Sequence, residues 1–452
     1  MIQKRGACSP FFFIKLLIDN IMIKTQPFFL LPFIFLFYHC DKKFDKDILA
    51  SAGSAQVTSI DFIHAYSNRL IKSQTKDSEF ERNRVLNELI RTKLFSEAAR
   101  SKKLSLDSIG ISRIKLTKEK ALREELYEEL IGSNKTVIHD SIIRKHFQWQ
   151  HTEIMLKHLF HPDKKVLDTI LPMVKKDSKR FDVFAKNLFN NYELKNSGGS
   201  LGWVSYNTID PNLEQVAFSM PFDIPIGPVR SSYGWHILLK KDERKQMILD
   251  EDHYQIAKKS LYNLISKKQS QIIANDYVND LMGNNVSIND SLSIRVLEQI
   301  NTIVFQKKKN NNKINLKTGE RLTDIILDLK LNHDMVLASY QNNRFTVNDL
   351  LHGLRNSKPS IFLNNPVQAF YIALRNQILT TEAIDRGLLN RKKVKQKIKS
   401  TEDQYLAQKY LKLILKNKQK STLSSIETKE ITENLKKNFP VIIYKHNFDN
   451  IF

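Results

Sequence analysis

Two histidines of this chain lie in short apolar segments that are typical of strands. His158 belongs to EIMLKHLF at residues 153–160, and His236 belongs to WHILL at residues 235–239. An imidazole titrates near neutral pH, so histidine can move a proton, bind a metal or fix a hydrogen-bond network. A single strand histidine is more often a satisfied core residue. The chemistry of this pair therefore depends on the elements around it.

The segment that carries both histidines is rich in turn residues. Residues 152–243 hold six of the 12 prolines and five of the 13 glycines, which indicates a compact, loop-rich domain. The glycines of Ser197–Gly202 permit positive φ. Asp210 and Pro211 are typical of a helix start, with Asp as N-cap and Pro at the first helical position. The predicted order is β-α-α-β-α-β-β, an α+β layer pair.

This segment resembles the parvulin-type peptidyl-prolyl isomerases over residues 153–241. Several spaced motifs occur in the family's order: KHLF at 157–160, FA at 184–185, GGSLGW at 198–203, LEQVAF at 213–218, GPV at 227–229 and YGWHI at 233–237. The chain after residue 40 looks like the periplasmic chaperone-isomerases of the SurA and PrsA kind. That resemblance implies an α+β, FKBP-like parvulin domain inserted in a mostly helical SurA-type chaperone module, with a second related helical module C-terminal.

The resemblance also implies roles for individual residues. His158 and His236 form a buried pair on adjacent central strands, which fixes tautomers and hydrogen bonds under a proline pocket. Ser231 supplies a pocket hydroxyl, and Glu193 is the nearest candidate for an acid beside the histidines. The substrate-binding residues are Leu201, Trp203, Ile209, Leu213, Phe218 and Tyr233. The chain departs from the family pattern at Leu213, where Phe is usual, at Ile209, which is often Met, and at Ser200, which is usually Asp.

Isomerisation of an X–Pro amide explains why these residue types suffice. Rotation about the bond has a barrier of about 18–20 kcal/mol, and without a catalyst it takes tens to hundreds of seconds. No covalent bond breaks, so the reaction requires no nucleophile, metal or cofactor, and none is expected here. The site has to hold the proline ring, exclude water and favour the twisted amide over the planar one, which is differential binding of the transition state.

The flanking regions are helical and contain a repeat. ILASAGSAQVTSIDFIHAYSN at 48–68 aligns without gaps on VLASYQNNRFTVNDLLHGLRN at 336–356. Each copy predicts strand, turn, short strand and a helix entered through Thr-x-x-Asp, a capping box. Each copy is also expected to close with a long helix and a short strand. These are 253–282 with 285–288 for the first copy, and 426–438 with 441–444 for the second.

These observations divide the chain into six parts. Residues 1–40 are a signal region, 41–151 and 244–290 are the two parts of a helical chaperone module, and 152–243 are the parvulin domain. Residues 291–335 are a linker region, and 336–452 are the second SurA-N-like helical module.

The first forty residues resemble a bacterial lipoprotein signal. Residues 27–38 are twelve apolar residues in a row, fewer than the roughly 18 of a spanning helix. With a start at Met22, Lys24 supplies the short basic end, and Cys40 follows the apolar run. Leu36 fits the lipobox four residues before the cysteine, whereas His39 does not fit it. We expect lipidation of Cys40 and a membrane-anchored protein of the periplasm or cell envelope. An ordinary signal with an incidental cysteine is the alternative.

The chain is strongly basic, with 71 Lys and Arg against 48 Asp and Glu, a net charge of +23. Such a charge raises nucleic acid or an anionic membrane surface as a partner. No groove-reading motif or aromatic-basic platform is recognisable, and the signal directs export, so no nucleic-acid partner is expected. Two cysteines exclude a disulfide scaffold and a zinc module with several Cys ligands.

The sequence therefore predicts a foldase of the bacterial envelope. It would combine peptidyl-prolyl cis-trans isomerase and chaperone activity on unfolded or proline-containing secreted and outer-membrane polypeptides. The alternative is a non-catalytic periplasmic holdase with a vestigial parvulin domain, because the pocket residues depart from the family pattern.

Overall fold

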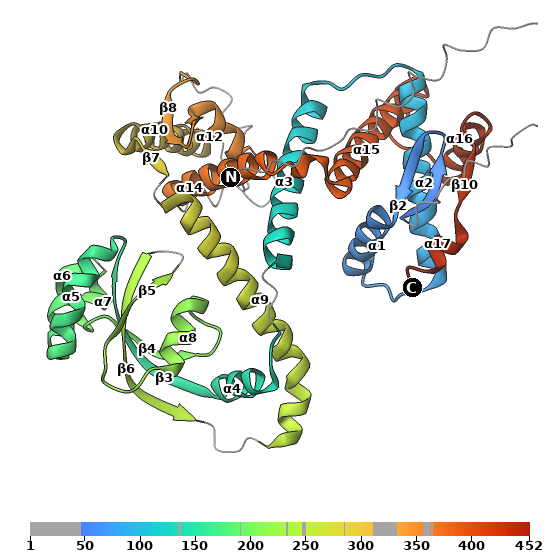
Figure 1. The fold of residues 1–452 in the computed structure, drawn as a ribbon. Coiled ribbons are helices and arrows are strands. Elements are labelled where there is room, and N and C mark those ends of the chain that lie inside the picture. The colour runs from blue at the N-terminus through green and yellow to red at the C-terminus, as the bar shows by residue number, and fades with distance from the viewer. Residues whose placement is uncertain are drawn as a thin grey trace, which may run out of the picture.

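A computed structural model describes residues 47–452 except 134–136, 190, 232–233, 246–249, 284, 311–331, 356–361 and 363–364. The signal region with Cys40, and Tyr233, lie outside the described residues. Figure 1 shows a central domain, residues 152–245, at one end of a long helix, α9 (Glu251–Gly283), and two further modules beyond it. Among the described helices, none combines the length and the apolar composition that crossing a membrane requires.

The central domain is a four-stranded antiparallel sheet with helices on both faces. Its elements are β3 (Thr152–His161), α5 (Lys164–Lys176), α6 (Arg180–Leu188), α7 (Tyr192–Asn196), β4 (Ser200–Ser205), α8 (Pro211–Ser219), β5 (Ile226–Ser231) and β6 (Gly234–Lys245). The strand order is β4-β3-β6-β5, so the two histidine strands are the central pair. The predicted α+β order is confirmed, with the short α7 as an additional element.

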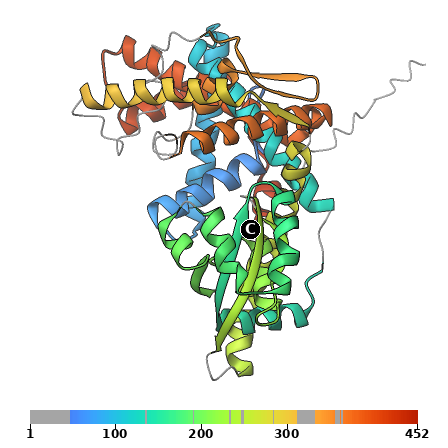
Figure 2. The same ribbon diagram turned by 90° about the vertical axis from the view of Figure 1, so that its left-hand side faces the viewer.

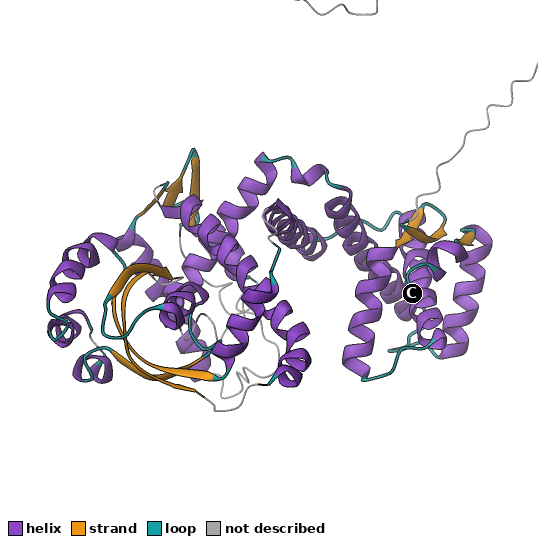
Figure 3. Cartoon of the chain, turned by 60° about the horizontal axis from the view of Figure 1, so that its bottom comes forward, coloured by secondary structure: helices purple, strands orange, loops and turns teal. Residues whose placement is uncertain are grey.

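The two faces of this sheet have separate cores. Leu159, Ile237 and Leu239 pack under α5 and α6. Ile154 and Leu238 belong to the other core, under α8. Successive strand residues point to opposite faces, so the face under α8 is also the face of His158 and His236. Figure 3 shows the sheet curving around α8, with α5 and α6 outside it.

The chain enters and leaves the central domain at one place. β3 and β6 pair along their full length, and the register sets Thr152 opposite Lys245. α4 (Asp140–Gln150) leads into β3, and α9 follows β6. Both helices pack on the core under α8, through Phe147 of α4 and Leu261 and Ile265 of α9. The central domain is therefore an insertion whose two ends are neighbours.

Both copies of the repeat have the predicted local structure. The first copy forms β1 (Ile48–Ala52), β2 (Ala55–Thr58) and α1 (Ser59–Ser73), and the second forms β8 (Val336–Tyr340), β9 (Asn343–Thr346) and α12 (Val347–Leu354). Thr58 with Asp61, and Thr346 with Asp349, form complete capping boxes at the two helix starts. In each box the hydroxyl accepts from the third helical N–H, and the carboxylate accepts from the cap N–H.

The prediction of which strand closes each repeat is wrong. β7 (Val286–Ile288), assigned to the first copy, pairs with β8 of the second copy. β10 (Val441–Ile443), assigned to the second copy, pairs with β1 of the first. Each hairpin is thus completed by the strand expected for the other. The division into 41–151 plus 244–290 and 336–452 does not correspond to the packing, because long-range helix contacts decide which strand reaches which hairpin.

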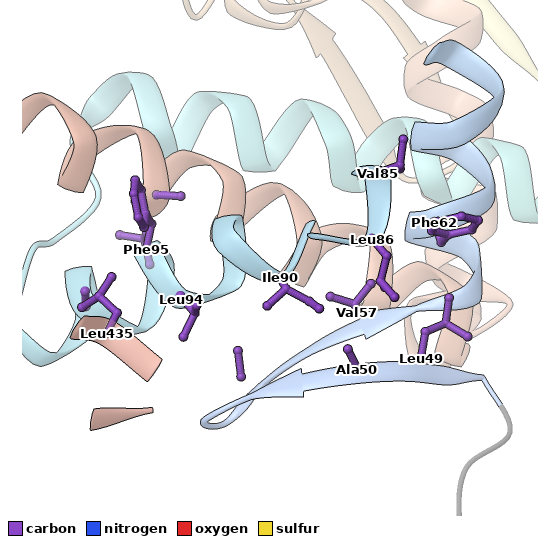
Figure 4. Close-up of a cluster of buried hydrophobic side chains, with 14 of the residues drawn as sticks. Leu49, Ala50, Val57, Phe62, Val85, Leu86, Ile90, Leu94, Phe95 and Leu435 are labelled. Carbon is purple, nitrogen blue, oxygen red and sulfur yellow. The ribbon is translucent and has the colours of Figure 1, made fainter. Parts of the chain in front are cut away.

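The first hairpin belongs to a terminal module built from both ends of the described chain. Its other elements are α2 (Glu79–Ser101), the C-terminal half of α15 (Lys392–Asn417), α16 (Ser425–Asn438), β10 and α17 (Lys445–Asp449). Figure 4 shows side chains of the N-terminal elements, such as Leu49, Phe62 and Leu94, in one cluster with Leu435 of α16. Figure 2 presents the molecule from the side.

The second hairpin belongs to an inner module formed by a contiguous stretch of chain. It contains β7, α10 (Asp290–Asn310), β8, β9, α12 and α14 (Pro366–Asp385). Val296, Leu297 and Ile300 of α10 are buried in its core. Residues 291–335 were expected to be a linker, and this is wrong for α10, whose apolar side chains pack against the β8 hairpin. α3 (Ser108–Ser133) connects the two modules through contacts with α14 and α15.

Buried charges join the two chain ends in the terminal module. Asp403 of α15 is fully buried, and its carboxylate accepts hydrogen bonds from Lys93 at 2.8 Å and from Arg100, both on α2. Lys93 is also 3.5 Å from Asp61, the capping residue of α1. Such a network matters for stability, because removing Asp403 leaves the buried Lys93 without its nearest counter-charge.

We expect the Asp403→Ala variant to lose about 3–5 kcal/mol of unfolding free energy in the terminal module, since Lys93 would stay buried without its main partner. Hydrogen exchange of α2 amides under rising urea measures this. Glu402→Ala is the matched control, because the Glu402 side chain is 38% exposed and lies 3.6 Å from Arg100. The control should change stability by less than about 1 kcal/mol. An Asp403→Ala effect as small as that of the control would contradict the assignment.

Candidate active site

The structure brings His158 and His236 together at the centre of the sheet. β3 and β6 pair so that Phe160 lies opposite His236, which places His158 two residues further along on the same face. The two Nδ1 atoms are 3.2 Å apart, and the rings are nearly parallel with centroids 5.5 Å apart. His236 is buried and His158 is half-buried beneath the ring of Phe189, 5.1 Å from its own ring. The predicted histidine pair therefore exists.

A glycine allows the backbone to close over this pair. The N–H of His158 donates to the carbonyl of Gly199 at 2.8 Å. A Cβ at Gly199 would lie 2.1 Å from the carbonyl oxygen of His158, and the residue has a φ of +75°. Both the space and the conformation therefore require glycine at this position. The glycine-rich turn of the sequence serves to bring β4 against the histidine strand.

Ser231 extends the pair into a hydrogen-bonded chain. Its Oγ lies 2.8 Å from Nε2 of His236 and can donate to the carbonyl of Gly234 at 3.3 Å. If the Ser231 hydroxyl donates to that carbonyl, its Oγ accepts from Nε2–H of His236. The other ring nitrogen of His236, Nδ1, then carries no proton and accepts from Nδ1–H of His158. Nε2 of His158 is then a bare acceptor. It is buried and has no partner among the described residues.

The opposite direction of this chain is less favourable. It would leave Nε2 of His158 as a buried N–H without an acceptor, and an orphaned donor is less well tolerated than an under-satisfied acceptor. The arrangement thus selects one tautomer for each ring. The proposed role of the two histidines, fixing tautomers and hydrogen bonds under the pocket, stays a prediction.

Burial lowers the pKa of both histidines to about 4. For His158 the second cause is the neighbouring His236, and for His236 burial acts against the charge of Asp210, which raises its pKa. Both imidazoles are therefore neutral at neutral pH. Neutral, mutually hydrogen-bonded rings are suited to shaping a site rather than to acid–base catalysis.

The acid expected beside the pair is not where the sequence placed it. Glu193 is exposed on α7, and no described contact joins its carboxylate to either histidine. The carboxylate that acts electrostatically on His236 is Asp210. Asp210 caps α8 by accepting from the N–H of Asn212 at 3.0 Å. The Asp-Pro pair predicts this capping role, but no sequence signal places the residue near His236.

The proposed substrate-binding residues fall into three groups. Leu213 and Phe218 are buried in the core under α8, and Ile209 is half-buried against it. Leu201 of β4 is 38% exposed. Trp203 lies on the opposite face of the sheet from its neighbour Val204, a residue of the α8 core, and has Arg244 4.4 Å from its ring.

We call the predicted substrate-binding residues the wall of the proline pocket. Of these, Ile209, Leu213 and Phe218 lie together on the face of the sheet that carries the histidines. Trp203 is not on that face, and Tyr233 lies outside the described residues. In the part of the chain that the structure describes, no cluster of His, Cys, Asp and Glu could hold a metal ion.

Most of the central domain matches a known protein family. The family model "Rotamase: PPIC-type PPIASE domain" matches residues 161–242. The central domain is a PPIC-type peptidyl-prolyl isomerase domain. The match begins just after His158 and includes Ser231 and His236 of the hydrogen-bonded chain. The isomerase domain makes up about a fifth of the chain, and the helical modules lie outside the match.

Several curated proteins are similar to part of this chain. The chain is 24% identical over 184 residues to a probable parvulin-type peptidyl-prolyl cis-trans isomerase of Bordetella pertussis, covering 39% of this chain and 70% of that protein. It is 28% identical over 118 residues to chaperone SurA of Buchnera aphidicola, covering 26% of each. It is 26% identical over 124 residues to foldase protein PrsA of Bacillus subtilis, covering 27% of this chain and 42% of that protein.

Matches among solved structures include PrsA from Bacillus cereus, at 17% identity and a TM-score of 0.24. That match covers 54% of this chain and 94% of PrsA. A PPIC-type isomerase domain matches at 21% identity and a TM-score of 0.18, covering 22% of this chain and 99% of that domain.

The low pKa of the histidines predicts how the stability of the isomerase domain depends on pH. Unfolded histidine has a pKa of about 6.5, so between pH 6.5 and 4 the unfolded state binds more protons than the folded state. The free energy of unfolding therefore falls as the pH drops through this window. The variant His236→Asn cannot titrate and should show a shallower loss.

Tryptophan fluorescence under urea measures this effect. All three tryptophans, Trp149, Trp203 and Trp235, lie in or next to the isomerase domain. His161→Asn, on the same strand as His158, is the control and should keep the wild-type pH dependence. If the free energy of unfolding falls equally steeply with pH in His236→Asn and in wild type, the histidine pair does not cause the pH dependence.

Proposed function

We propose that this protein is a foldase of the bacterial envelope, in which the isomerase domain accelerates X–Pro rotation in unfolded secreted or outer-membrane polypeptides. The observation that carries the proposal is the neutral chain Ser231–His236–His158 beneath the face that bears Ile209. The PPIC-type match and the parvulin-type relatives support isomerase activity.

We expect the site to contribute to catalysis through the shape of its pocket and the exclusion of water from it. A twisted amide has lost its resonance and part of its polarity, so it tolerates an apolar pocket better than a planar amide does. The buried histidine pair presents uncharged rings, which leaves the pocket floor without a charge that would hold water. Ile209 is the partly accessible apolar side chain of the proposed wall, and Leu213 and Phe218 support it from the core. Leu201 of β4 is 38% exposed.

We expect the full chain to accelerate cis-trans isomerisation of a tetrapeptide with a central Leu–Pro bond. Ile209→Ala should lower kcat/KM about tenfold, equal to about 1.4 kcal/mol, because the wall loses apolar contact with the proline. His158→Ala should also slow the reaction. The control is Val183→Ala, an exposed apolar truncation on α6 that should leave the rate unchanged. A wild-type rate equal to the uncatalysed rate would refute the enzymatic proposal and leave the holdase alternative.

The chaperone part of the proposal rests on the helical modules. A cavity of about 760 Å³ lies between α2 and α16 in the terminal module and is lined by Phe80, Ile90 and Leu423, among others. Phe80 is 73% exposed, and Ile426 of α16 is 81% exposed. The cavity is lined by apolar side chains among polar ones, and Ile426 lies next to its lining residue Ser425, so this surface is suited to weak binding of unfolded segments. The relatives named chaperone SurA and foldase PrsA support this role.

We further propose that lipidation of Cys40 anchors the protein to a membrane of the envelope. The proposal rests on the apolar run at 27–38 and the cysteine that follows it. The intact mass of the protein purified from bacterial membranes tests it. A chain that begins at Cys40 and carries acyl chains is the expected result. A mass without acyl groups would contradict the anchor and favour an ordinary signal.

A further inference from the structure

A buried ion pair joins the isomerase domain to the long helix α9. Glu214 of α8 has a side chain that is 2% exposed, and its Oε1 accepts a hydrogen bond from Nζ of Lys268 on α9, whose side chain is 10% exposed. Lys268 lies outside the residues that match the PPIC-type domain. The counter-charge for a buried residue of the isomerase domain therefore comes from outside that domain.

The other oxygen of Glu214 holds the turn before α8. Its Oε2 accepts from the backbone N–H of Asn207, a non-glycine residue with a φ of 67°. This turn, residues 206–210, carries Ile209 of the proposed wall and ends at Asp210, which acts on His236. One carboxylate thus connects Lys268 of α9 to the turn at the edge of the site.

The neighbouring residues reinforce this connection. Nζ of Lys268 lies 3.7 Å from the ring centre of Tyr206, a favourable cation–π distance. The hydroxyl of Tyr206 is 2.8 Å from Nδ1 of His146 on α4. Burial, with the charge of Lys268 as a second cause, lowers the pKa of His146 to about 4. The turn is therefore held on two sides by helices that flank the isomerase domain in the chain.

α9 is itself fixed to the inner module. The hydroxyl of Tyr277 donates to Glu382 of α14 at 2.9 Å, and Arg386 of α14 donates to Tyr277 at 3.0 Å. Figure 1 shows α9 running from the isomerase domain to this contact. Lys268 lies between the two ends of the helix, so its position is set by both the isomerase domain and the inner module.

We propose that Lys268 is a positioning residue for the isomerase site, which through Glu214 holds the turn that carries Ile209. This inference rests on the proposed isomerase function and deepens it, because it makes the site complete only when α9 is docked. A side chain of the helical region would then set how tightly the isomerase domain holds a proline.

The test compares variants of the full chain. Lys268→Met removes the charge and keeps most of the apolar stem, and Glu214→Gln keeps the shape but replaces one accepting oxygen with a donor. We expect both to raise KM and the Kd for the tetrapeptide about tenfold with kcat changed less than twofold, since a misplaced wall weakens ground-state and transition-state binding alike. The double variant should resemble the single ones, because the residues act as one unit.

Three further measurements separate positioning from simple destabilisation. Lys268→Arg keeps the charge and should stay within about threefold of wild type. Lys258→Met is the matched control, because Lys258 lies on the same helix and pairs with the exposed Asp140 on α4 at 2.6 Å, without reaching α8. Hydrogen exchange at the Asn207 amide should accelerate in Glu214→Gln and Lys268→Met and not in the control. If Glu214→Gln does not fold, the comparison of Lys268→Met with Lys268→Arg still tests whether the charge of Lys268 sets the affinity for the peptide.

The outcomes distinguish this inference from the proposed function. A wild-type chain that binds and isomerises the peptide, with Lys268→Met within twofold of it in KM and Kd, overturns the inference alone. A wild-type chain that binds the peptide without accelerating isomerisation overturns the catalytic proposal, and the inference is then judged on Kd. A wild-type chain that does neither overturns both.

Discussion

The antiparallel pairing of β3 with β6 is the constraint on which the rest of the isomerase domain depends. Its register sets Phe160 opposite His236 and so brings the two imidazoles within 3.2 Å on one face. A shift by one residue would turn one histidine to the other face and break the hydrogen-bonded chain. The same ladder places Thr152 beside Lys245, so that α4 and α9 leave the sheet together. One set of backbone hydrogen bonds therefore fixes both the site and its attachment.

This attachment gives the two faces of the sheet different surroundings. The described core under α5 and α6 consists of residues of the central domain itself, whereas the core under α8 also contains Phe147 of α4 and Leu261 of α9. The helix that supports the proposed pocket wall is thus shared between the domain and the flanking helices. Because α8 carries a buried carboxylate, Glu214, this shared face also needs a cation, and Lys268 supplies it from α9. The isomerase domain and α9 are in this respect one packing unit.

Much of the fold could be predicted from the sequence, because its signals are local. The capping boxes at Thr58 and Thr346 and the N-cap Asp210 depend on residues within three positions, and the structure contains all of them. The histidine pair was predicted through its resemblance to a family rather than from spacing. What could not be predicted depends on contacts between distant residues. Trp203 was assigned to the wall although strand alternation directs it to the other face, and the role of Glu214 requires a partner 54 positions away.

The exchange of closing strands follows the same logic and affects how the protein can fold. β7 and β10 read Val-Ser-Ile and Val-Ile-Ile, so their local sequences do not determine which hairpin each one completes. β10 pairs with β1 in the module where Asp403 of α15 is neutralised by Lys93 and Arg100 of α2. The inner module and the isomerase domain are contiguous in sequence and can form during synthesis. The terminal module needs residues separated by more than 300 positions, so its core closes only after the last elements are made. Its cavity beside α2 and α16 is therefore completed last.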